Sequence, residues 1–142
     1  MTRKLHSIIA STALALFATL GSAEAATTVK FWHTFNKSNG EALDKIIAQF
    51  EATNPEIDVE AEFVGNYNDV VAKLQAAIPA GRGPDAVILE VTRYGLFANN
   101  NILADLTPYF DADPLKNDLY DYAREVGVID GKTYIVPFNS ST

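Results

Sequence analysis

The hydrophobic and polar positions between residues 28 and 91 switch between the period of a strand and that of a helix. Residues 28–33 are short and β-prone, and residues 57–63 alternate apolar with acidic side chains, as a half-buried strand does. Residues 85–91 hold a continuous apolar run, which predicts a third strand buried on both faces. Each of the two intervening segments carries one apolar helical face. These faces are formed by Leu43, Ile46, Ile47 and Phe50 in the first segment and by Val70, Val71, Leu74, Ala77 and Ile78 in the second.

Local signals mark the ends of the two predicted helices. Ser38 and Glu41 have the spacing of a capping box, and the Asn-Pro pair at 54–55 ends that helix. Asn68 is placed to cap the second helix, and the Gly-Arg-Gly-Pro stretch at 81–84 ends it. The order strand, helix, strand, helix, strand predicts an α/β fold with a mostly parallel sheet and right-handed crossovers.

The elements predicted after residue 92 are shorter. A short helix is expected over residues 93–100, followed by a connector over residues 103–110 that contains Pro108. The Asp-Gly pair at 130–131 predicts a hairpin within residues 128–136. Between the connector and the hairpin we expect one more helix, with an apolar face formed by Leu115, Leu119, Tyr122, Ala123 and Val126.

Residues 1–25 have the three parts of a secretory signal peptide in the right order. Arg3 and Lys4 give a positive start, residues 8–18 form an apolar core, and small residues occupy positions 23 and 25 before the cleavage site. A membrane anchor or a buried helix is the alternative, but the apolar run is shorter than the roughly 20 residues that span a bilayer. We therefore expect cleavage after residue 25 and release into the periplasm.

Composition and charge argue against several classes of function. The 142 residues carry 11 Lys and Arg against 18 Asp and Glu, a formal net charge of −7, and no Cys. Without Cys there is no disulfide, no thiolate metal site, no cysteine nucleophile and no lipid anchor of the kind that needs one. The acidic balance is unsuited to a general nucleic-acid binder, because such affinity comes mainly from clustered Lys and Arg. His6 and His33 are the only histidines, which excludes a multi-histidine metal site within this chain.

No motif in the sequence predicts catalysis or a bound cofactor. There is no Gly-x-Ser-x-Gly elbow, no phosphate-binding Gly-x-x-x-x-Gly-Lys loop and no Gly-x-Gly-x-x-Gly. A Ser-His-Asp arrangement in the mature chain would have to use His33. A secreted α/β hydrolase that uses His33 remains the alternative from another functional class.

The loops after the three predicted strands are the best candidates for a binding site. Ligands of open α/β sheets bind beyond the carboxyl ends of the strands, where helix N-termini also offer N–H groups to an anion. Trp32 and His33 end the first strand, and each has a structural alternative. Trp32 suits a core position equally well, and His33 is more typical of a hydrogen-bonded strand-end histidine than of a ligand contact.

The other candidates lie in polar loops. Tyr67 follows Gly-Asn, where a ligand contact is favoured over a core role. Glu90 suits either a contact to polyol hydroxyls or a solvated strand end. Ser140 and Ser141 are able to donate to phosphate or sugar oxygens, and they also suit a simple turn.

Several motifs together resemble a known family. They are Phe31-Trp32-His33, Asn54-Pro55, Gly65-Asn66-Tyr67, Gly83-Pro84-Asp85-Ala86 and Pro137-Phe138-Asn139-Ser140-Ser141-Thr142. With the signal peptide, they make the chain similar to the extracellular solute-binding proteins (family 1) of ABC importers. Phe-Trp-His, Gly-Asn-Tyr and Pro-Phe-Asn-Ser-Ser-Thr are the narrower motifs, and they favour a branch that binds glycerol phosphate.

The resemblance implies a periplasmic-binding-protein-like fold of type II, with two α/β lobes that close on ligand. Residues 26–142 would be the N-terminal lobe, ending at the first crossover between lobes, and the chain would be truncated there. Its role would be non-enzymatic, as a monomer that carries ligand to the membrane subunits of the permease. The implied ligand is sn-glycerol 3-phosphate or a glycerophosphodiester.

The same resemblance assigns roles to individual residues. Tyr67 and Ser141 match ligand-contacting positions of the family. The family has a further ligand contact, an acidic residue just after the third strand. Glu90 is the acidic residue nearest to that position, although an alignment without gaps places Val91 or Thr92 at it. The alternative within the family is a sugar or oligosaccharide binder, in which Trp32, Tyr67 and Tyr94 would stack on sugar faces.

Overall fold

The computed structural model describes residues 25–139. The predicted signal peptide, except its last residue, lies outside the described residues, as do Ser140 and Ser141. Within the described part of the chain, no helix is both long enough and apolar enough to cross a membrane.

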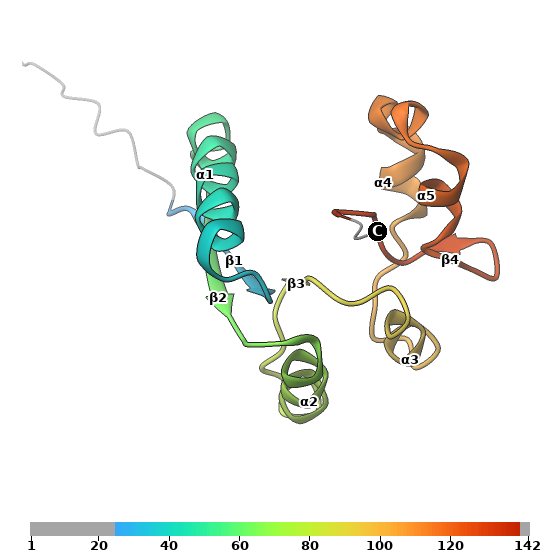
Figure 1. Ribbon diagram of the computed structural model, residues 1–142, viewed down its shortest axis with the longest axis horizontal. Coiled ribbons are helices and arrows are strands. Elements are labelled where there is room, and N and C mark those ends of the chain that lie inside the picture. Colours follow the sequence, from blue (N-terminus) through green and yellow to red (C-terminus); the bar gives the residue numbers. More distant parts are fainter. Residues whose placement is uncertain (1–24, 140–142) are drawn as a thin grey trace, which may run out of the picture.

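A three-stranded parallel sheet lies in the first half of the molecule (Figure 1). β1 (Thr27–His33) lies between β2 (Ile57–Phe63) and β3 (Ala86–Val87), so the strand order is β2-β1-β3. β1 and β2 pair along their whole length, from Thr27 opposite Ile57 to His33 opposite Phe63. The predicted parallel α/β arrangement is therefore confirmed.

The third strand is shorter than the sequence predicts, and the expectation that it is buried on both faces is wrong. Only Ala86 and Val87 pair with β1, opposite Phe31 and Trp32. Ala86 is exposed, Val87 is half-buried, and only Ile88 is buried. The pairing ends early because β1 itself ends at His33, so the rest of the apolar run leaves the sheet.

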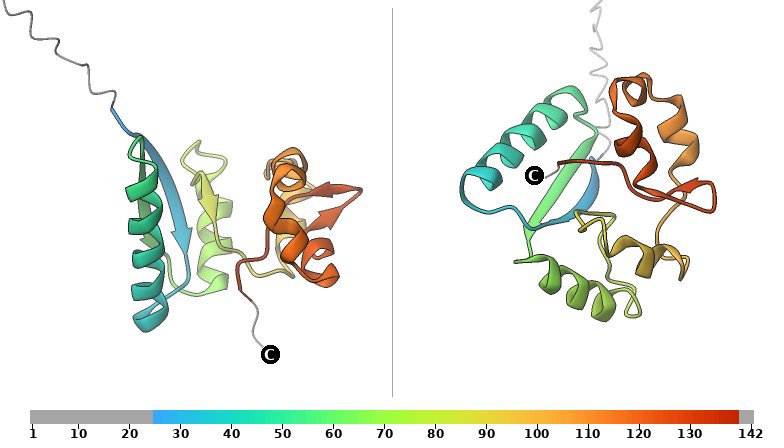
Figure 2. Two further views of the ribbon diagram at one scale, coloured as in Figure 1. Left: turned by 90° about the horizontal axis from the view of Figure 1, so that it is seen from above. Right: turned by 45° about the vertical axis from the view of Figure 1, so that its right-hand side comes forward.

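Two long helices connect the strands, and β1 lies between them (Figure 2, left). α1 (Lys37–Thr53) ends before Asn54-Pro55 as predicted. The predicted capping box at Ser38 is wrong, because the Asn36 carbonyl already accepts the N–H groups of Asn39 and Gly40, both at 3.2 Å. Ser38 thus lies inside the first turn, and Asn36 is the N-cap without a side-chain hydrogen bond.

α2 (Tyr67–Ala77) also begins earlier than predicted, since Asn66 rather than Asn68 is its N-cap. Its predicted apolar face is confirmed: Val70 and Leu74 join Trp32 and Phe97 in the hydrophobic core. Val64, Val71, Ala77, Ile78, Val87, Leu89 and Leu103 pack around this cluster. The predicted apolar face of α1 is less covered by the described residues than that of α2. Its Leu43 is buried, whereas Ile46 and Phe50 are exposed.

The second half of the molecule consists of short elements. α3 (Tyr94–Ala98) confirms the short helix expected there. It is followed by α4 (Thr107–Ala112), the 3₁₀ helix η1 (Pro114–Asp118) and α5 (Asp121–Glu125). β4 (Val128–Ile129) and β5 (Lys132–Thr133) form the predicted hairpin, whose turn residues Asp130 and Gly131 have φ of 50° and 76°.

Two expectations for this half are wrong. The predicted connector contains α4, which accommodates Pro108 because the first turn of a helix needs no proline N–H. The predicted single helix is interrupted. The Asp113 side chain accepts the N–H of Leu115 at 2.9 Å and starts η1, and the chain is extended at Leu119 and Tyr120 before α5 begins.

Candidate ligand-binding site

The strands place their carboxyl ends at one edge of the sheet. The N–H of Val64, just after β2, donates to the His33 carbonyl at 2.9 Å. The N–H of Ile88, just after β3, donates to the Trp32 carbonyl at the same distance. The loops that follow β1, β2 and β3 therefore leave the sheet side by side, as the sequence predicts for a site at this edge.

Trp32 lies under this edge rather than on it. Its side chain is 6% exposed and belongs to the core with Val70, Leu74 and Phe97. The Lys73 Nζ lies 4.1 Å from the centroid of the Trp32 ring, a cation–π contact, and Lys73 also pairs with Glu62. This position favours the packing alternative for Trp32.

His33 is buried on the opposite face of β1, since neighbouring strand residues point to opposite sides. It is 6% exposed, and its ring centroid lies 6.1 Å from that of Phe31 and 6.0 Å from that of Phe63. Among the described residues, its buried Nδ1 has no hydrogen-bond partner. Within this part of the chain, His33 is therefore not a strand-end histidine that is hydrogen-bonded through Nδ1.

Tyr67 is the first residue of α2 and is half-buried, so it lies at the edge and not in the middle of a loop. The preceding Asn66 fixes this start: its Oδ1 accepts the N–H groups of Asn68 at 2.8 Å and Asp69 at 3.2 Å. Asp69 Oδ2 in turn accepts the Asn66 N–H at 2.8 Å. These bonds form a capping box that holds the backbone of Tyr67 in place.

The capping box also corrects one expectation. The sequence predicts free N–H groups for an anion at the helix N-termini of this edge. At α2 the Asn66 side chain accepts two of them, the N–H groups of Asn68 and Asp69. Those two backbone N–H groups are therefore not free to bind an anion.

Glu90 lies in the loop after β3 and is paired. Its Oε2 accepts the Arg93 Nε–H at 2.8 Å, and both side chains are about two-fifths exposed (40% and 38%). The Arg93 N–H also donates to the Glu90 carbonyl at 2.9 Å, which tightens the turn before α3. Part of the hydrogen-bonding capacity of this carboxylate is therefore already used.

The end of the described chain returns to the same edge. The ring of Phe138 lies 5.6 Å from that of Phe35, which follows β1, and Figure 2 (right) shows the last segment running from the hairpin back toward the sheet. Asn139 is the last described residue. Ser140 and Ser141, both predicted ligand contacts, follow it in the sequence but lie outside the described residues.

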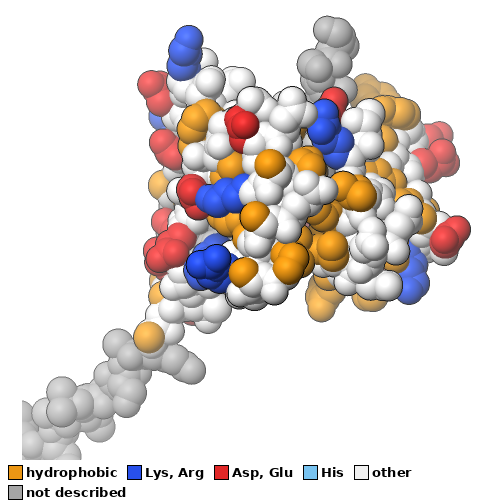
Figure 3. All heavy atoms as spheres, turned by 90° about the horizontal axis from the view of Figure 1, so that it is seen from below, with side chains coloured by type: hydrophobic (Ala, Val, Ile, Leu, Met, Phe, Trp, Pro, Cys, Tyr) orange, Lys and Arg blue, Asp and Glu red, His pale blue; other side chains and the backbone are white. Residues whose placement is uncertain are grey.

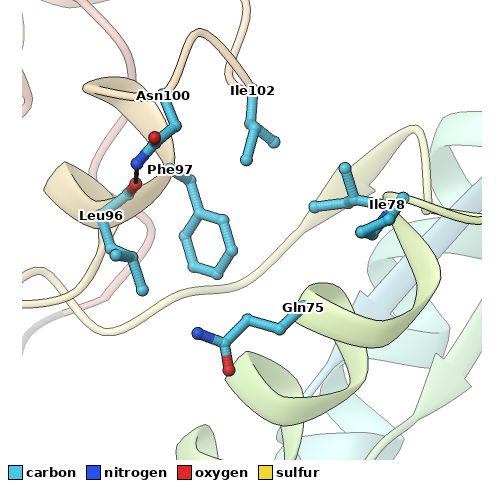
Figure 4. Close-up of a pocket in the computed structure, with 7 residues that line it drawn as sticks. Gln75, Ile78, Leu96, Phe97, Asn100 and Ile102 are labelled. Carbon is cyan, nitrogen blue, oxygen red and sulfur yellow. Dashed lines mark hydrogen bonds between the residues drawn. The ribbon is translucent and has the colours of Figure 1, made fainter.

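Two hollows lie elsewhere, between α2 and α3, and sequence reasoning missed them. One, of about 200 Å³, is lined by Gln75, Ile78, Pro79, Leu96, Phe97, Asn100 and Ile102 (Figure 4). A second, of about 240 Å³, is lined by Val71, Thr92, Arg93 and Leu96. Figure 3 shows hydrophobic side chains gathered in the middle of the face on which these helices lie. Leu96 borders both hollows, but α3 is too short for its apolar positions to define a face in the sequence.

Within residues 25–139, no three His, Cys, Asp or Glu side chains are grouped so that they could hold a metal ion. The one pKa clearly moved in this part of the chain lies away from the edge, at Asp105. Hydrogen bonds from the Thr107 side chain and backbone, with a smaller contribution from Lys132, hold the pKa of the Asp105 carboxyl below its usual 3.8.

Comparison with known proteins decides the family. Residues 36–142 match the family described as bacterial extracellular solute-binding protein. The chain belongs to this family. It is also 30% identical, over 148 aligned residues, to the sn-glycerol-3-phosphate-binding periplasmic protein UgpB of Escherichia coli (strain K12). That alignment covers 99% of this chain but 33% of the relative, so the chain spans about a third of the length of its curated relatives.

Solved structures show the same family likeness. The ABC substrate-binding protein Lmo0181 of Listeria monocytogenes, solved with cycloalternan, is 32% identical and superposes with a TM-score of 0.67, covering 76% of this chain and 28% of its own. The GacH receptor of Streptomyces glaucescens, solved with and without acarbose, is 30% identical with a TM-score of 0.71, covering 80% and 29%. The fold of this solute-binding protein is that of a type II periplasmic binding protein, over the part that the chain spans.

Proposed function

We propose that the full-length protein is the periplasmic substrate-binding subunit of an ABC importer, which captures sn-glycerol 3-phosphate or a glycerophosphodiester and delivers it to the permease. The observation that carries the proposal is the 30% identity to UgpB across 99% of this chain. Residues 26–142 would form the N-terminal lobe of the mature protein, after a signal peptide has been removed. A second lobe would complete the ligand-binding site. The chain's coverage of only 33% of UgpB supports that division.

The mechanism follows from two lobes that share one ligand. Ligand that contacts both lobes shifts the population toward the closed form, in proportion to its greater affinity for that form. The permease would recognise the closed form. Such a carrier works as a monomer and needs groups that orient a ligand, but no reactive group and no cofactor.

The proposed ligand contacts lie at the carboxyl edge of the sheet. Tyr67 is held there by the Asn66 cap and is half-buried as a residue. Glu90 would accept ligand hydroxyls beside Arg93, and Ser140 and Ser141 would donate to phosphate oxygens. Trp32 and His33 would support the edge from beneath, since both are buried.

A sugar or oligosaccharide is the second candidate ligand. It is favoured by the two solved relatives above, which were solved with cycloalternan and with acarbose. Stacking on a sugar needs an open aromatic face, however, and two of the three predicted rings are occupied. Lys73 lies over Trp32, and Tyr94 is buried with its hydroxyl donating to the Val126 carbonyl at 3.0 Å.

A hydrolase that uses His33 has less support. A triad histidine needs a carboxylate on Nδ1 and a nucleophile at Nε2. Here Nδ1 has no partner among the described residues, and the ring is almost fully buried. Replacement of His33 by Ala separates the two readings: a hydrolase would lose turnover, whereas a carrier would keep its ligand binding or lose only a little of it.

The test of the ligand is a calorimetric titration of the full-length protein with sn-glycerol 3-phosphate and, separately, with maltose. We expect a micromolar or tighter Kd for the phosphate, about −8 kcal/mol or better, and no saturable heat with maltose. Saturable heat with maltose alone would replace the proposed ligand by a sugar. Silence with both would contradict both ligands and call for a wider ligand screen.

A further inference from the structure

Gly127 lies where two segments of backbone approach too closely for any side chain. It is buried and follows Val126, the C-cap of α5. A Cβ built on Gly127 would overlap the carbonyl oxygen of Ile135 and would lie 2.8 Å from Ile135 Cγ1. The backbone oxygen cannot rotate away as a flexible side chain can, so even alanine would push the chain at Ile135 out of place.

This requirement is steric and not conformational. Among the described glycines, Gly65, Gly81 and Gly131 have positive φ, the region that favours glycine, and Gly127 does not. An alanine at position 127 would therefore keep its backbone in an ordinary conformation, and its cost would come from the overlap with Ile135 alone.

Hydrogen bonds fix the chain on both sides of this contact. The Gly127 carbonyl accepts the Tyr134 N–H at 2.9 Å, and the preceding Val126 carbonyl accepts the Tyr94 hydroxyl at 3.0 Å. Thr133 donates its N–H to Thr107 Oγ1 at 2.8 Å. The segment that begins at residue 134 thus starts from a fixed point.

The same segment then runs directly to the ligand-binding edge. Only two residues separate Ile135 from Phe138, whose ring centroid lies 5.6 Å from that of Phe35 after β1. Consecutive Cα atoms are about 3.8 Å apart. Such a short stretch cannot absorb a displacement at Ile135, so Phe138 would be displaced as well. We propose that Gly127 is a positioning residue that sets where residues 136–139 enter the ligand-binding edge, an inference that rests on the proposed function.

The test compares Gly127→Ala with Gly95→Ala in the full-length protein. Gly95 lies in α3, where an added Cβ would meet only Ile129 Cδ1 at an ordinary 3.8 Å, so it is a matched control. We expect Gly127→Ala to raise the Kd for sn-glycerol 3-phosphate about tenfold or more, the effect of losing a hydrogen bond to a charged ligand. Gly95→Ala should leave the Kd within about twofold of the parent protein.

A second readout needs no ligand. Hydrogen–deuterium exchange should show faster exchange of the Tyr134 amide in Gly127→Ala, by about tenfold or more, with exchange in β1 unchanged. A purely structural role would speed exchange throughout and leave the affinity of the folded protein unaltered. If Gly127→Ala fails to fold, Tyr94→Phe loosens the same junction without added bulk, and faster exchange at Tyr134 is again expected.

The possible outcomes separate this inference from the proposed function. If the parent protein binds and Gly127→Ala binds equally well, or if both glycine variants lose affinity alike, the positioning role is wrong. If the parent binds neither sn-glycerol 3-phosphate nor maltose, the proposed function fails, and the exchange at Tyr134 still decides whether Gly127 holds this segment. Unchanged exchange at Tyr134 in Gly127→Ala overturns the inference in every case.

Discussion

The halves of the molecule on either side of residue 92 are built differently. Before it, α1 has 17 residues, α2 has 11, and β1 and β2 have seven each, while β3 has two. After it, the helices have five or six residues and the strands two. The first half is held by strand pairing and supplies Trp32, Val70 and Leu74 to the apolar core, which Phe97 of α3 completes. The rest of the second half depends on single hydrogen bonds such as Tyr94 to Val126 and Thr133 to Thr107.

The difference explains how the site is assembled. The first half provides a rigid edge, because the ends of three paired strands cannot move separately. The second half provides a path by which residues far along the chain return to that edge, ending in the contact of Phe138 with Phe35. Rigid support therefore comes from packing, and the placement of the returning segment comes from a few specific contacts.

The largest expected contrast between the halves is in stability. Leu74 is 3% exposed in the core of the first half, and Leu115 is 66% exposed in η1. Leu74→Ala should lower the free energy of unfolding by about 3 kcal/mol, because it leaves a cavity among close-packed side chains. Leu115→Ala should change it by less than about 0.5 kcal/mol. Urea denaturation of both variants measures this, and equal losses would contradict the contrast, because Leu115 would then contribute as much as a core residue.

A smaller contrast lies within the first half, between two helix starts. Asn66 caps α2 with two side-chain hydrogen bonds, whereas Asn36 precedes α1 and makes none. Asn66→Ala should therefore cost about 1 kcal/mol of unfolding free energy, and Asn36→Ala only a few tenths. The same denaturation experiment compares them. A loss at Asn36 as large as that at Asn66 would mean that the cap geometry does not determine helix stability here.

The order of the elements in the first half could be predicted from the sequence. Each of its long segments repeats its period several times, so the alternation at 57–63 and the apolar face of α2 leave little ambiguity. The helix starts could not be located from the sequence. Ser38 and Asn36 are both residue types that cap helices well, and only the hydrogen bonds of the first turn show which of them is the N-cap. The second half was harder, since five-residue elements such as η1 and α5 are too short to show a period.

The candidate site could be predicted as an edge but not residue by residue. Parallel topology puts the loops after β1, β2 and β3 together whatever their sequence, and the structure confirms this. Which side chains face outward depends on contacts across the chain, such as Lys73 on Trp32 and Phe138 on Phe35. Such contacts leave no local signal in the sequence.

The smallest expected effect is in the second half and depends on pH. Hydrogen bonds from Thr107 lower the pKa of Asp105 in the folded protein below its ordinary 3.8. A lowered pKa contributes stability above about pH 3.8, and that contribution is lost as the pH falls through the folded value. Asp105→Asn should thus be slightly less stable than the parent at pH 7, with the gap closing below pH 3.8. Thermal melts across this range measure the gap, and a gap that does not change with pH would contradict the assignment.

The most direct test of the central claim, that the ligand binds at the carboxyl edge of the sheet, compares two tyrosines by calorimetric titration with sn-glycerol 3-phosphate. Tyr67 lies half-buried at that edge, and Tyr109 is exposed in α4, away from it. In the full-length protein, Tyr67→Phe should raise the Kd about tenfold, through loss of one hydrogen bond to a charged ligand. Tyr109→Phe should leave the Kd within about twofold. A Tyr67→Phe protein that binds as tightly as the parent would contradict the claim.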